Sequence, residues 1–435
     1  MPKVFIYDEF APQDIAMMQA LYSRSPLSVE EHVKKVKQAG SGKFMEKFYV
    51  GFGHASIADC GSTTVFIEGI STLCDKAIQD WPLYAGQETS TRYIDMSKQP
   101  LVDPVGTADS KNILARWMAF YIESQEPMKQ FIRVRYPRKE GEDEATYEHA
   151  VAARAFDTLR GFLPAGITTQ LSWHTNLRQA HDKLCFLRKN PLPEVRETAD
   201  MIFAKLKEKY PQSFSHETVP EQERYFEGVG ARHYFYEPES PAREFSCRSA
   251  IDPAELARYW DIMDARPPKT VLPHFLAELG NIRFDFMLDF GSFRDIQRHR
   301  NGVCRMPLLT ARWGFHPWYL GELPEDLRGK AEALIGEQKK AVENLKTAPA
   351  FAQYYLALGF LVPVRVAYGL PAAVYVAELR SGRMVHPTLR KIALRMCEEL
   401  SKLFPFLTLH ADTEPSDWDV RRGLHDIIEK KTAGD

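Results

Sequence analysis

The stretch that decides the fold is Phe284-Asp285-Phe286-Met287-Leu288-Asp289-Phe290, followed by Asp295-Ile296-Gln297-Arg298-His299-Arg300. The first part predicts a strand, and the second part predicts a helix that ends in two arginines around a histidine. These donors at the end of a buried element suit an anion or the pyrimidine edge of a flavin, because arginine stays charged and presents a planar donor fork. A solvated helix terminus, where basic residues also collect, is the alternative.

The composition is that of an ordinary globular protein, with 44% hydrophobic and 26% charged residues among 435. This length allows two or three domains. A formal net charge of −2 gives no global footprint for a nucleic acid polymer, so any anion site must be local. Asp8 and Glu9 stand where a signal peptide needs its apolar core, and no apolar run reaches membrane-spanning length. We therefore expect a cytoplasmic protein without a membrane partner.

The cysteines predict reduced core thiols and no metal site. None of the six forms a CxxC pair or stands at zinc-ligand spacing with a histidine. Cys304 lies near the Arg-His-Arg stretch, and a catalytic thiol there is the alternative interpretation.

Strand-like and helical patterns alternate along the chain. A β-branched and aromatic segment predicts a strand at 63–70. Residues 211–245 are punctuated by prolines and have no sustained period, so we interpret them as a linker. Apolar periodicity predicts helices at 111–136, 145–163, 171–187, 194–209, 323–346, 350–360 and 387–403.

The order of these elements recurs. Val65-Phe66-Ile67 stands about as far ahead of Asp80-Trp81-Pro82 as Arg283-Phe284-Asp285 stands ahead of Arg298-His299-Arg300. A second recurrence is seen further along the chain. In the first half Leu163-Pro164-Ala165 precedes Thr175-Asn176-Leu177-Arg178. In the second half Leu370-Pro371-Ala372 precedes Ala377-Glu378-Leu379-Arg380 in the same way. A diverged duplication explains both spacings, and a coincidence of element order is the alternative.

We accordingly predict an α+β fold built from two repeats. Each repeat is expected to be a mixed domain in which long helices flank an antiparallel sheet. The predicted boundaries are a first repeat at 1–210, a linker at 211–245 and a second repeat at 246–435.

Three segments of the first half carry a resemblance to a known family: Gly53-His54-Ala55-Ser56-Ile57-Ala58-Asp59, Glu88-Thr89-Ser90-Thr91-Arg92-Tyr93 and Asn176-Leu177-Arg178. Together with Arg298-His299-Arg300 they resemble the motifs of the flavin-dependent thymidylate synthases (ThyX). Asp59 stands where the family pattern has glutamate. The resemblance covers about residues 45–205 well and 270–395 more weakly.

The two halves depart from the family pattern in different places. The first half has Asp80-Trp81-Pro82 at the Arg-His-Arg position. The second half keeps Arg-His-Arg, but its following loop reads Arg305-Met306-Pro307-Leu308-Leu309, without the serine and arginine of the family loop. The family is a homotetramer with sites between subunits. The resemblance therefore implies a composite site, with the nucleotide loop from one half and Arg-His-Arg from the other, in a homodimer that forms a pseudo-tetramer.

The chemistry of the expected reaction gives the residues their roles. A nucleotide monophosphate needs two or more charge-assisted donors, which Ser90 and Arg92 provide, and Arg188 could close the clamp. A capped turn with a surface arginine is the alternative for this loop. Uracil C5 attacks an electrophilic carbon only if charge on O4 or O2 is stabilised, which Arg298 would do as a fixed positive charge.

The resemblance implies FAD as cofactor, methylenetetrahydrofolate as carbon donor, NADPH as reductant and a dUMP-like nucleotide as substrate. Ser90 and Arg298 are the expected catalytic residues. The expected nucleotide-binding residues are Glu88, Ser90, Arg92, Arg160, Arg188 and Arg298. The expected flavin-binding residues are His54, Ser56, Asn176, Arg178, Arg298, His299 and Arg300. A core histidine is the alternative for His54.

The leading functional hypothesis is thus C5-methylation of a uracil nucleotide by a flavin-dependent enzyme. A flavin enzyme acting on another nucleotide or acceptor is the second possibility. A non-catalytic nucleotide- or flavin-binding homologue is the third, because neither half could build a whole site of the family type from its own residues.

Overall fold

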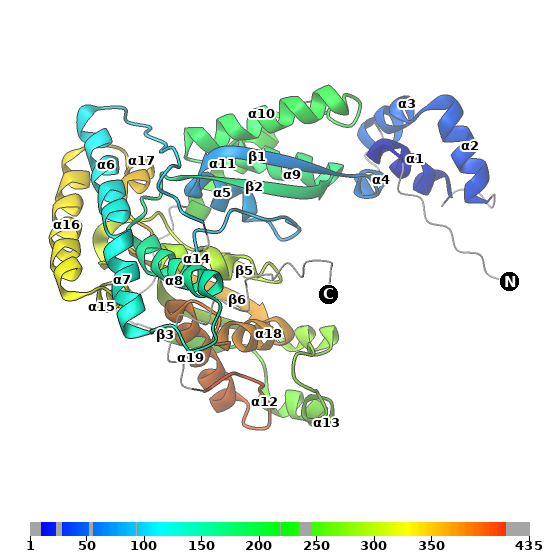
Figure 1. The fold of residues 1–435 in the computed structure, drawn as a ribbon. Coiled ribbons are helices and arrows are strands. Elements are labelled where there is room, and N and C mark those ends of the chain that lie inside the picture. Colours follow the sequence, from blue (N-terminus) through cyan, green and yellow to red (C-terminus); the bar gives the residue numbers. More distant parts are fainter. Residues whose placement is uncertain are drawn as a thin grey trace. The chain divides into compact units, whose positions relative to one another are not determined.

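The computed structural model describes residues 10–22, 28–51, 55–92, 94–217, 219–234 and 245–414. Contacts divide the chain into two compact units, and neither is a continuous stretch (Figure 1). Unit 1 contains Met1–Ile70, Cys74–Glu88 and Thr169–Tyr234, and unit 2 contains Ser71–Leu73, Thr89–Thr168 and Phe235–Asp435. His54 and Tyr93 of the predicted motifs lie outside the described residues.

Unit 1 is a helical layer on a two-stranded sheet. Its elements are α1 (Pro12–Tyr22), α2 (Val29–Ala39), α3 (Gly42–Phe44), the π-helical η1 (Met45–Gly51), α4 (Ala55–Asp59), β1 (Ser62–Ser71), α5 (Thr72–Gln79), β2 (Thr168–Asn176), α9 (Leu177–Leu187), α10 (Pro193–Lys209) and α11 (Pro220–Tyr234). Strand β1 pairs with β2, and bridges from Ala85 and Glu88 extend the sheet beyond β2. Helix α10 runs beside α9 (Figure 1).

Unit 2 contains the larger sheet and most of the helices. Its elements are α6 (Ala108–Glu123), α7 (Gln125–Arg135), α8 (Glu144–Leu159), η2 (Arg160–Phe162), β3 (Phe245–Ser249), α12 (Pro253–Leu256), η3 (Ala257–Tyr259), α13 (Trp260–Asp264), η4 (His274–Leu279), β4 (Asn281–Asp289), α14 (Phe290–Gln297), β5 (Val303–Arg305), η5 (Ala311–Trp313), α15 (Pro317–Gly321), α16 (Glu325–Asn344), α17 (Pro349–Ala352), η6 (Gln353–Tyr355), β6 (Leu361–Gly369), α18 (Leu370–Ser381) and α19 (Pro387–Leu403).

The sheet of unit 2 is antiparallel, with strand order β3-β4-β6-β5. Its central strand β4 alternates in burial, and the buried apolar side chains are Ile282, Phe284, Phe286 and Leu288. Helix α18 contacts strands β4 and β6, and helix α19 contacts strands β3 and β4. The period-two pattern thus predicted this strand correctly, because one face is covered by helices. The mixed α+β class is confirmed.

Two glycine-containing segments of unit 2 cross at close range. Ala165 N–H donates to the carbonyl oxygen of Leu356 (2.8 Å), and Leu358 N–H donates to that of Leu163 (2.8 Å). Gly359 N–H donates to Gly161 O at 2.8 Å. A Cβ on Gly359 would lie 2.3 Å from the Phe315 ring, so the approach requires glycine here.

The predicted helix at 171–187 is wrong in its first part. Residues up to Asn176 form β2, whose burial alternates with period two, and α9 begins only at Leu177. The predicted helix at 350–360 is wrong as well, because α17 and η6 end at Tyr355 and the chain then forms β6. In both places the strand is stabilised by pairing with residues far away in the sequence.

The segment 211–245 is not an irregular linker, because α11 occupies fifteen of its residues. The compact units also cut the chain elsewhere than the predicted repeats do. Residues 89–168, assigned to the first repeat, cluster with the second half of the chain. The repeat boundaries at 1–210 and 246–435 concern a duplication, which the compact units do not test, and they stay a prediction.

The order of elements nevertheless recurs. A strand followed directly by a helix of eight residues occurs as β1–α5 and as β4–α14. The first of these helices precedes Asp80-Trp81-Pro82 and the second precedes Arg298-His299-Arg300, as the first recurrence predicted. The second recurrence is out of register. Arg178 lies in the first turn of α9, whereas Arg380 lies in the last turn of α18.

Along the described part of the chain, no helix has both the length and the apolar character required to cross a membrane.

Replacing Gly359 by alanine tests the crossing. The new methyl group would overlap the Phe315 ring, and such overpacking costs about 1–3 kcal/mol. We expect Gly359→Ala to lower the urea midpoint of unfolding. Gly336→Ala is the matched control, because that position in α16 has no atom within 4 Å of the added Cβ. The control should be neutral or stabilising by about 0.5–1 kcal/mol; equal midpoints for both variants would contradict the crossing.

Candidate active site

The strand–helix unit β4–α14 places Arg298-His299-Arg300 at the end of a buried helix. Asp289 caps α14 by accepting a hydrogen bond from Ser292 N–H at 2.8 Å. All eight residues of the helix are buried, and Arg298 is its C-cap. The Arg298 side chain itself is 42% exposed. The sequence-based expectation of a buried element ending in a basic tripeptide is therefore confirmed.

Asp295 holds the surrounding arginines. Its Oδ2 lies 3.4 Å from Nη1 of Arg160, and its Oδ1 lies 3.6 Å from Nη2 of Arg298. The Asp295 carbonyl oxygen also accepts a hydrogen bond from Nη2 of Arg380 at 2.9 Å. Burial alone would raise the pKa of Asp295, but the neighbouring arginine charges lower it below its ordinary value. The residue is therefore an ionised carboxylate that Arg160 of η2 and Arg298 at the end of α14 share, while Arg380 of α18 binds its backbone carbonyl.

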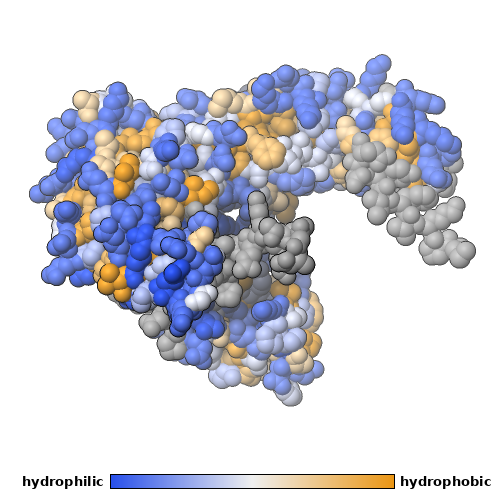
Figure 2. All heavy atoms as spheres, viewed as in Figure 1, coloured by the Kyte–Doolittle hydropathy of each residue, from blue (hydrophilic) through white to orange (hydrophobic). Residues whose placement is uncertain are grey.

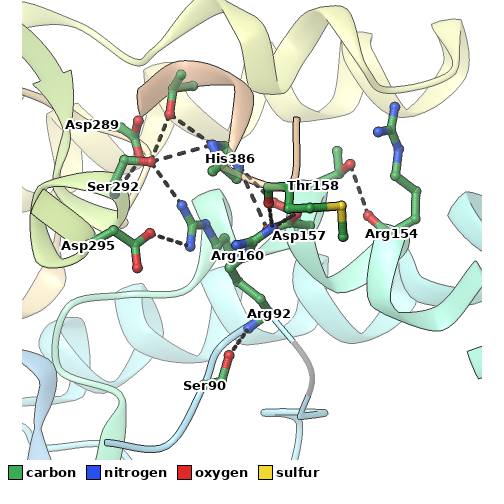
Figure 3. Close-up of polar contacts among 12 residues, drawn as sticks. Ser90, Arg92, Arg154, Asp157, Thr158, Arg160, Asp289, Ser292, Asp295 and His386 are labelled. Atoms are coloured by element: carbon green, nitrogen blue, oxygen red, sulfur yellow. Dashed lines mark hydrogen bonds and ion pairs between the residues drawn. The ribbon is translucent and has the colours of Figure 1, made fainter. Parts of the chain in front are cut away.

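Arg160 lies inside unit 2 and contacts α14. Its side chain is 2% exposed, and Nη2 donates to Ser292 Oγ at 2.9 Å. Burial would lower the pKa of Arg160, yet the surrounding Tyr319 and Asp295 raise it, so the guanidinium stays charged. Figure 3 shows Ser292 between Arg160 and His386. In this structure the predicted nucleotide-binding Arg160 orders α14.

The predicted nucleotide loop lies in the same unit. Arg92 forms a bidentate ion pair with Asp157, with Nε–Oδ1 at 2.6 Å and Nη2–Oδ2 at 2.8 Å (Figure 3). Arg92 Nη2 also donates to the carbonyl oxygen of Met384 at 3.3 Å. Ser90 Oγ accepts a hydrogen bond from Arg92 N–H at 3.2 Å. The loop geometry is thus fixed by side chains of α8 and by the α18–α19 connection.

His386 connects the loop residue Arg92 with α14. Its Nε2 lies 3.4 Å from the Asp157 carbonyl oxygen, and its Nδ1 lies 2.8 Å from Thr388 Oγ1 and 3.4 Å from Ser292 Oγ. Burial, reinforced by the positive charges of Arg160 and Arg92, lowers the pKa of His386 well below its ordinary value. A neutral ring with the proton on Nε2 satisfies both contacts, since Nε2–H donates to the carbonyl and Nδ1 accepts from Thr388.

His299 is also neutral. Its Nε2 accepts a hydrogen bond from Nε of Arg380 at 2.7 Å, which places the ring proton on Nδ1. The ring packs edge-on against Tyr375 at a centroid distance of 6.0 Å. Burial lowers the pKa of His299 to about 3, and the charges of Arg380 and Arg300 act in the same direction. His299 therefore offers a fixed Nδ1–H donor beside permanent cations.

The sequence motifs assign no role to Asp157, Asp295, Ser292 or His386. The second recurrence sets Arg380 opposite Arg178, and it does not predict the contacts of Arg380 with His299 and Asp295. Asp295 stands in the quoted stretch itself, three residues before Arg298, and Asp157 stands three residues before Arg160. This spacing puts each pair on one helix face, which was a usable signal. For His386 the only local sign is the proline that follows it at the start of α19.

Another group of predicted residues lies in unit 1. Arg178 Nε lies 2.8 Å from Asp59 Oδ1, and this ion pair joins α9 to α4. Asp59 follows Ser56 by three residues. Asn176 caps α9 by accepting from Gln179 N–H at 2.8 Å. The structure thus places Asn176 and Arg178 at the start of α9, and Ser56 lies in α4, the helix that carries the Arg178 partner Asp59. An arginine at a helix N-terminus is a favourable position for an anionic group.

Glu88 and Arg188 occupy other places in unit 1. Glu88 accepts a short hydrogen bond from Gln79 and bridges to Leu171 at the sheet edge. Arg188 is the C-cap of α9, where Nε pairs with Asp200 at 2.6 Å and the guanidinium lies over Phe203. The length of helix α9 separates Arg188 from Arg178. Glu88 and Arg188 do not form one group in the structure.

The first-half counterpart of Arg-His-Arg is occupied by internal contacts. Asp80 Oδ2 pairs with His233 Nε2 at 2.8 Å, and Lys183 Nζ donates to the carbonyl oxygens of Ala77 (2.7 Å) and Asp80 (2.8 Å). Trp81 Nε1 donates to Gln179 at 2.7 Å. Burial lowers the pKa of Lys183 to about 8 despite the attraction of Asp80. This end of α5 is a packed polar core.

Comparison with known proteins agrees with the motifs. Residues 6–212 match the family model described as thymidylate synthase complementing protein (Thy1). This segment is nearly half of the chain, and over it the chain is similar to that family. The matched residues contain the loop with Ser90 and Arg92 but end before Arg298-His299-Arg300.

Three curated relatives, each named a UPF0159 protein, extend the similarity to both halves. The protein of Thermoplasma acidophilum is 24% identical, covering 89% of this chain and 93% of the relative. The one of Chlamydia muridarum is 25% identical over 83% of this chain and 79% of its own length. The protein of Chlamydia pneumoniae is 23% identical, covering 87% of this chain and 82% of the relative. Proteins with both halves therefore occur in distant organisms.

The protonation state of His299 can be tested directly. Its carbon-13-labelled imidazole, assigned with His299→Gln, should not titrate between about pH 5 and pH 8, because burial and cations oppose the charged form. Since the folded pKa is depressed below 6.5, the associated stability is complete above pH 6.5 and declines as the pH falls toward 3.

Removing the donor to Nε2 should reverse part of this shift. Arg380→Ala is expected to raise the pKa of His299 toward 6.5, whereas Arg258→Ala, at an exposed arginine of η3, should leave it unchanged. Titration of wild-type His299 near its ordinary pKa would contradict the hydrogen bond from Arg380.

Proposed function

We propose that the chain is a flavin-dependent thymidylate synthase-like enzyme that methylates C5 of a uracil nucleotide, in a reaction of the dUMP-to-dTMP type. The match of residues 6–212 to the thymidylate synthase complementing protein family supports the reaction class. One observation carries the assignment to particular residues: Ser90 and Arg92 from the first half and Arg298-His299-Arg300 from the second half belong to the same compact unit.

A continuous series of contacts supports the composite site. Arg92 pairs with Asp157, whose carbonyl oxygen lies beside His386. His386 approaches Ser292, which accepts from Arg160, and Arg160 pairs with Asp295 next to Arg298. Each contact joins side chains on different elements. A shift of the loop that contains Arg92 would therefore displace α14. The contacts thus hold the loop and the end of α14 in one arrangement.

Ser90 and Arg92 are the proposed phosphate-binding residues. Asp157 orients the Arg92 fork, and a charge-assisted pair of this kind limits the rotamers that the guanidinium can adopt. Ser90 Oγ accepts from the loop backbone, so its own O–H is oriented for donation to a ligand. This prearrangement lowers the entropic cost of binding a nucleotide monophosphate.

Arg298 is the proposed electrostatic catalyst. Its guanidinium is tethered by Asp295, yet 42% of the side chain is exposed, so it can meet a ligand without leaving its tether. A permanent cation beside O4 or O2 of uracil stabilises the charge that makes C5 nucleophilic. Arg298 would do so without exchanging a proton, because arginine stays protonated in proteins.

The residues present fit a flavin. His299 supplies a fixed Nδ1–H donor between two arginines, which suits the carbonyl edge of an isoalloxazine ring. Within unit 1, considered by itself, Asn176 and Arg178 at the start of α9 suit an anionic group such as a pyrophosphate. When bound, FAD would carry the redox part of the reaction, with methylenetetrahydrofolate as carbon donor and NADPH as reductant.

We further propose that the chain arose by duplication and acts as a homodimer equivalent to a tetramer. The recurrence of β1–α5 in β4–α14 and the reciprocal crossing of 163–165 with 356–358 support this history. In each chain the polar core at Asp80-Trp81-Pro82 then stands in place of one of the two Arg-His-Arg motifs expected from a duplication. We expect one FAD per chain, not one per repeat.

The same polar core favours a second candidate function. A homologue that binds a nucleotide or flavin without catalysis would tolerate the loss of one Arg-His-Arg wall and of the second loop. Such a protein would still bind FAD but would not turn over dUMP. A flavin enzyme with a different nucleotide as acceptor would turn over only that acceptor.

Tritium release from C5-labelled dUMP separates these functions. With FAD, NADPH and methylenetetrahydrofolate, the wild-type protein should release tritium, and Arg298→Ala should reduce the rate by about 100-fold or more, as expected for one electrostatic donor. Arg258→Ala removes an equal charge from η3 and should retain the wild-type rate. If FAD binds but Arg298→Ala turns over normally, the composite site is wrong; if FAD binds and no tritium is released, the proposed reaction is wrong.

A further inference from the structure

Unit 2 contains a cavity of about 460 Å³ that is separate from the residues described so far as the candidate site. It lies among the C-terminal end of α7, α8, α15 and α19, and Figure 2 shows strongly hydrophilic residues over α7 and α8. Two carboxylates, Glu322 and Glu398, line it. The cations that line it outnumber them three to one: Arg135, Arg154, Arg383, Arg390, Lys391 and Arg395.

The floor of the cavity holds a buried cation. Arg154 is 3% exposed, and its Nη2 lies 2.8 Å from Glu322, which also lies 3.5 Å from Nη1 of Arg135. Burial lowers the pKa of Arg154 to about 10, and the attraction of Glu322 limits the shift. Arg154 is thus charged at neutral pH. One carboxylate faces two guanidiniums here, which leaves this wall positive.

The opposite wall is one face of α19. Arg390 is 11% exposed and is held by the carbonyl oxygens of Ser381 and Asp412 at 2.7 and 2.9 Å. Lys391 and Arg395 stand one turn apart and are exposed. Arg395 lies 3.2 Å from Glu398, its own neighbour on the helix. Fixed cations therefore lie inside the cavity, and adaptable ones lie at its mouth.

Two aromatic side chains complete the lining. The guanidiniums of Arg135 and Arg154 lie over the Tyr136 ring, at 5.2 and 5.8 Å from its centroid. Trp318 packs edge-on against His386 at 4.6 Å. Through His386 the cavity wall reaches Asp157, the partner of Arg92. A ligand in this cavity would therefore contact Trp318, which is linked to the nucleotide loop through His386 and Asp157.

We propose that this cavity binds a small ligand with two or more phosphate or carboxylate groups. The volume is that of a small-molecule site, and six cations around one concave space favour a compact polyanion. A nucleic acid polymer would need the charges spread across an open face, and the chain carries a net charge of −2. The proposal does not depend on the proposed methylation.

Calorimetric titration of the full chain with inorganic tripolyphosphate, and separately with tri-L-glutamate, tests the site. We expect saturable binding of about one molecule per chain for at least one probe. Tighter binding of tripolyphosphate would identify a phosphate ligand, and tighter binding of triglutamate a carboxylate ligand. Because Lys391 and Arg395 supply charge at the mouth, the double variant Lys391→Gln/Arg395→Gln should weaken binding about tenfold or more.

The double variant Lys339→Gln/Lys340→Gln is the matched control. It removes the same charge from exposed positions of α16 and should bind as the wild type does. Equal weakening in the two double variants would show a general charge effect and overturn the proposal. So would loss of binding in Arg298→Ala with retention in Lys391→Gln/Arg395→Gln, since the probes would then occupy the nucleotide site. Failure of both probes to bind would overturn it too.

Discussion

The buried contact of Arg160 with Asp295 and Ser292 is the constraint on which the candidate site depends. Taking a guanidinium and a carboxylate out of water costs several kcal/mol per ion unless their hydrogen bonds are remade inside. Arg160 is 2% exposed and finds both partners on α14. The pair therefore fixes the rotation of α14 relative to η2. Because Asp295 also tethers Arg298, the position of this proposed catalytic cation follows from this interior contact.

Two buried histidines of the site are neutral. His299 and His386 each sit beside arginines, and in both cases burial lowers the pKa. An imidazolium would add charge where cations already gather. The neutral rings instead act as hydrogen-bond acceptors, His299 from Arg380 and His386 from Thr388. The histidines thus fix neighbouring side chains without adding to the repulsion between the arginines.

The sequence predicted those parts of the fold that local periodicity determines. Strand β4 and helix α14 have clear periods, and the place of Arg298-His299-Arg300 after them could be read directly. Strands β2 and β6 could not, because their stability comes from pairing with segments far along the chain. Asp157 and His386 lie in different halves of the sequence, and only the tertiary structure shows that they are in contact.

The passage of the chain between the two units has a consequence for its synthesis. Chains emerge from the ribosome N-terminus first, and domains tend to fold as they appear. Unit 1 is complete once Tyr234 has emerged, but the helices α6, α7 and α8 of 89–168 belong to unit 2 and precede most of it. These helices must wait for some two hundred further residues before they can bury their apolar faces. During that interval they are the part of the nascent chain for which a chaperone would matter most.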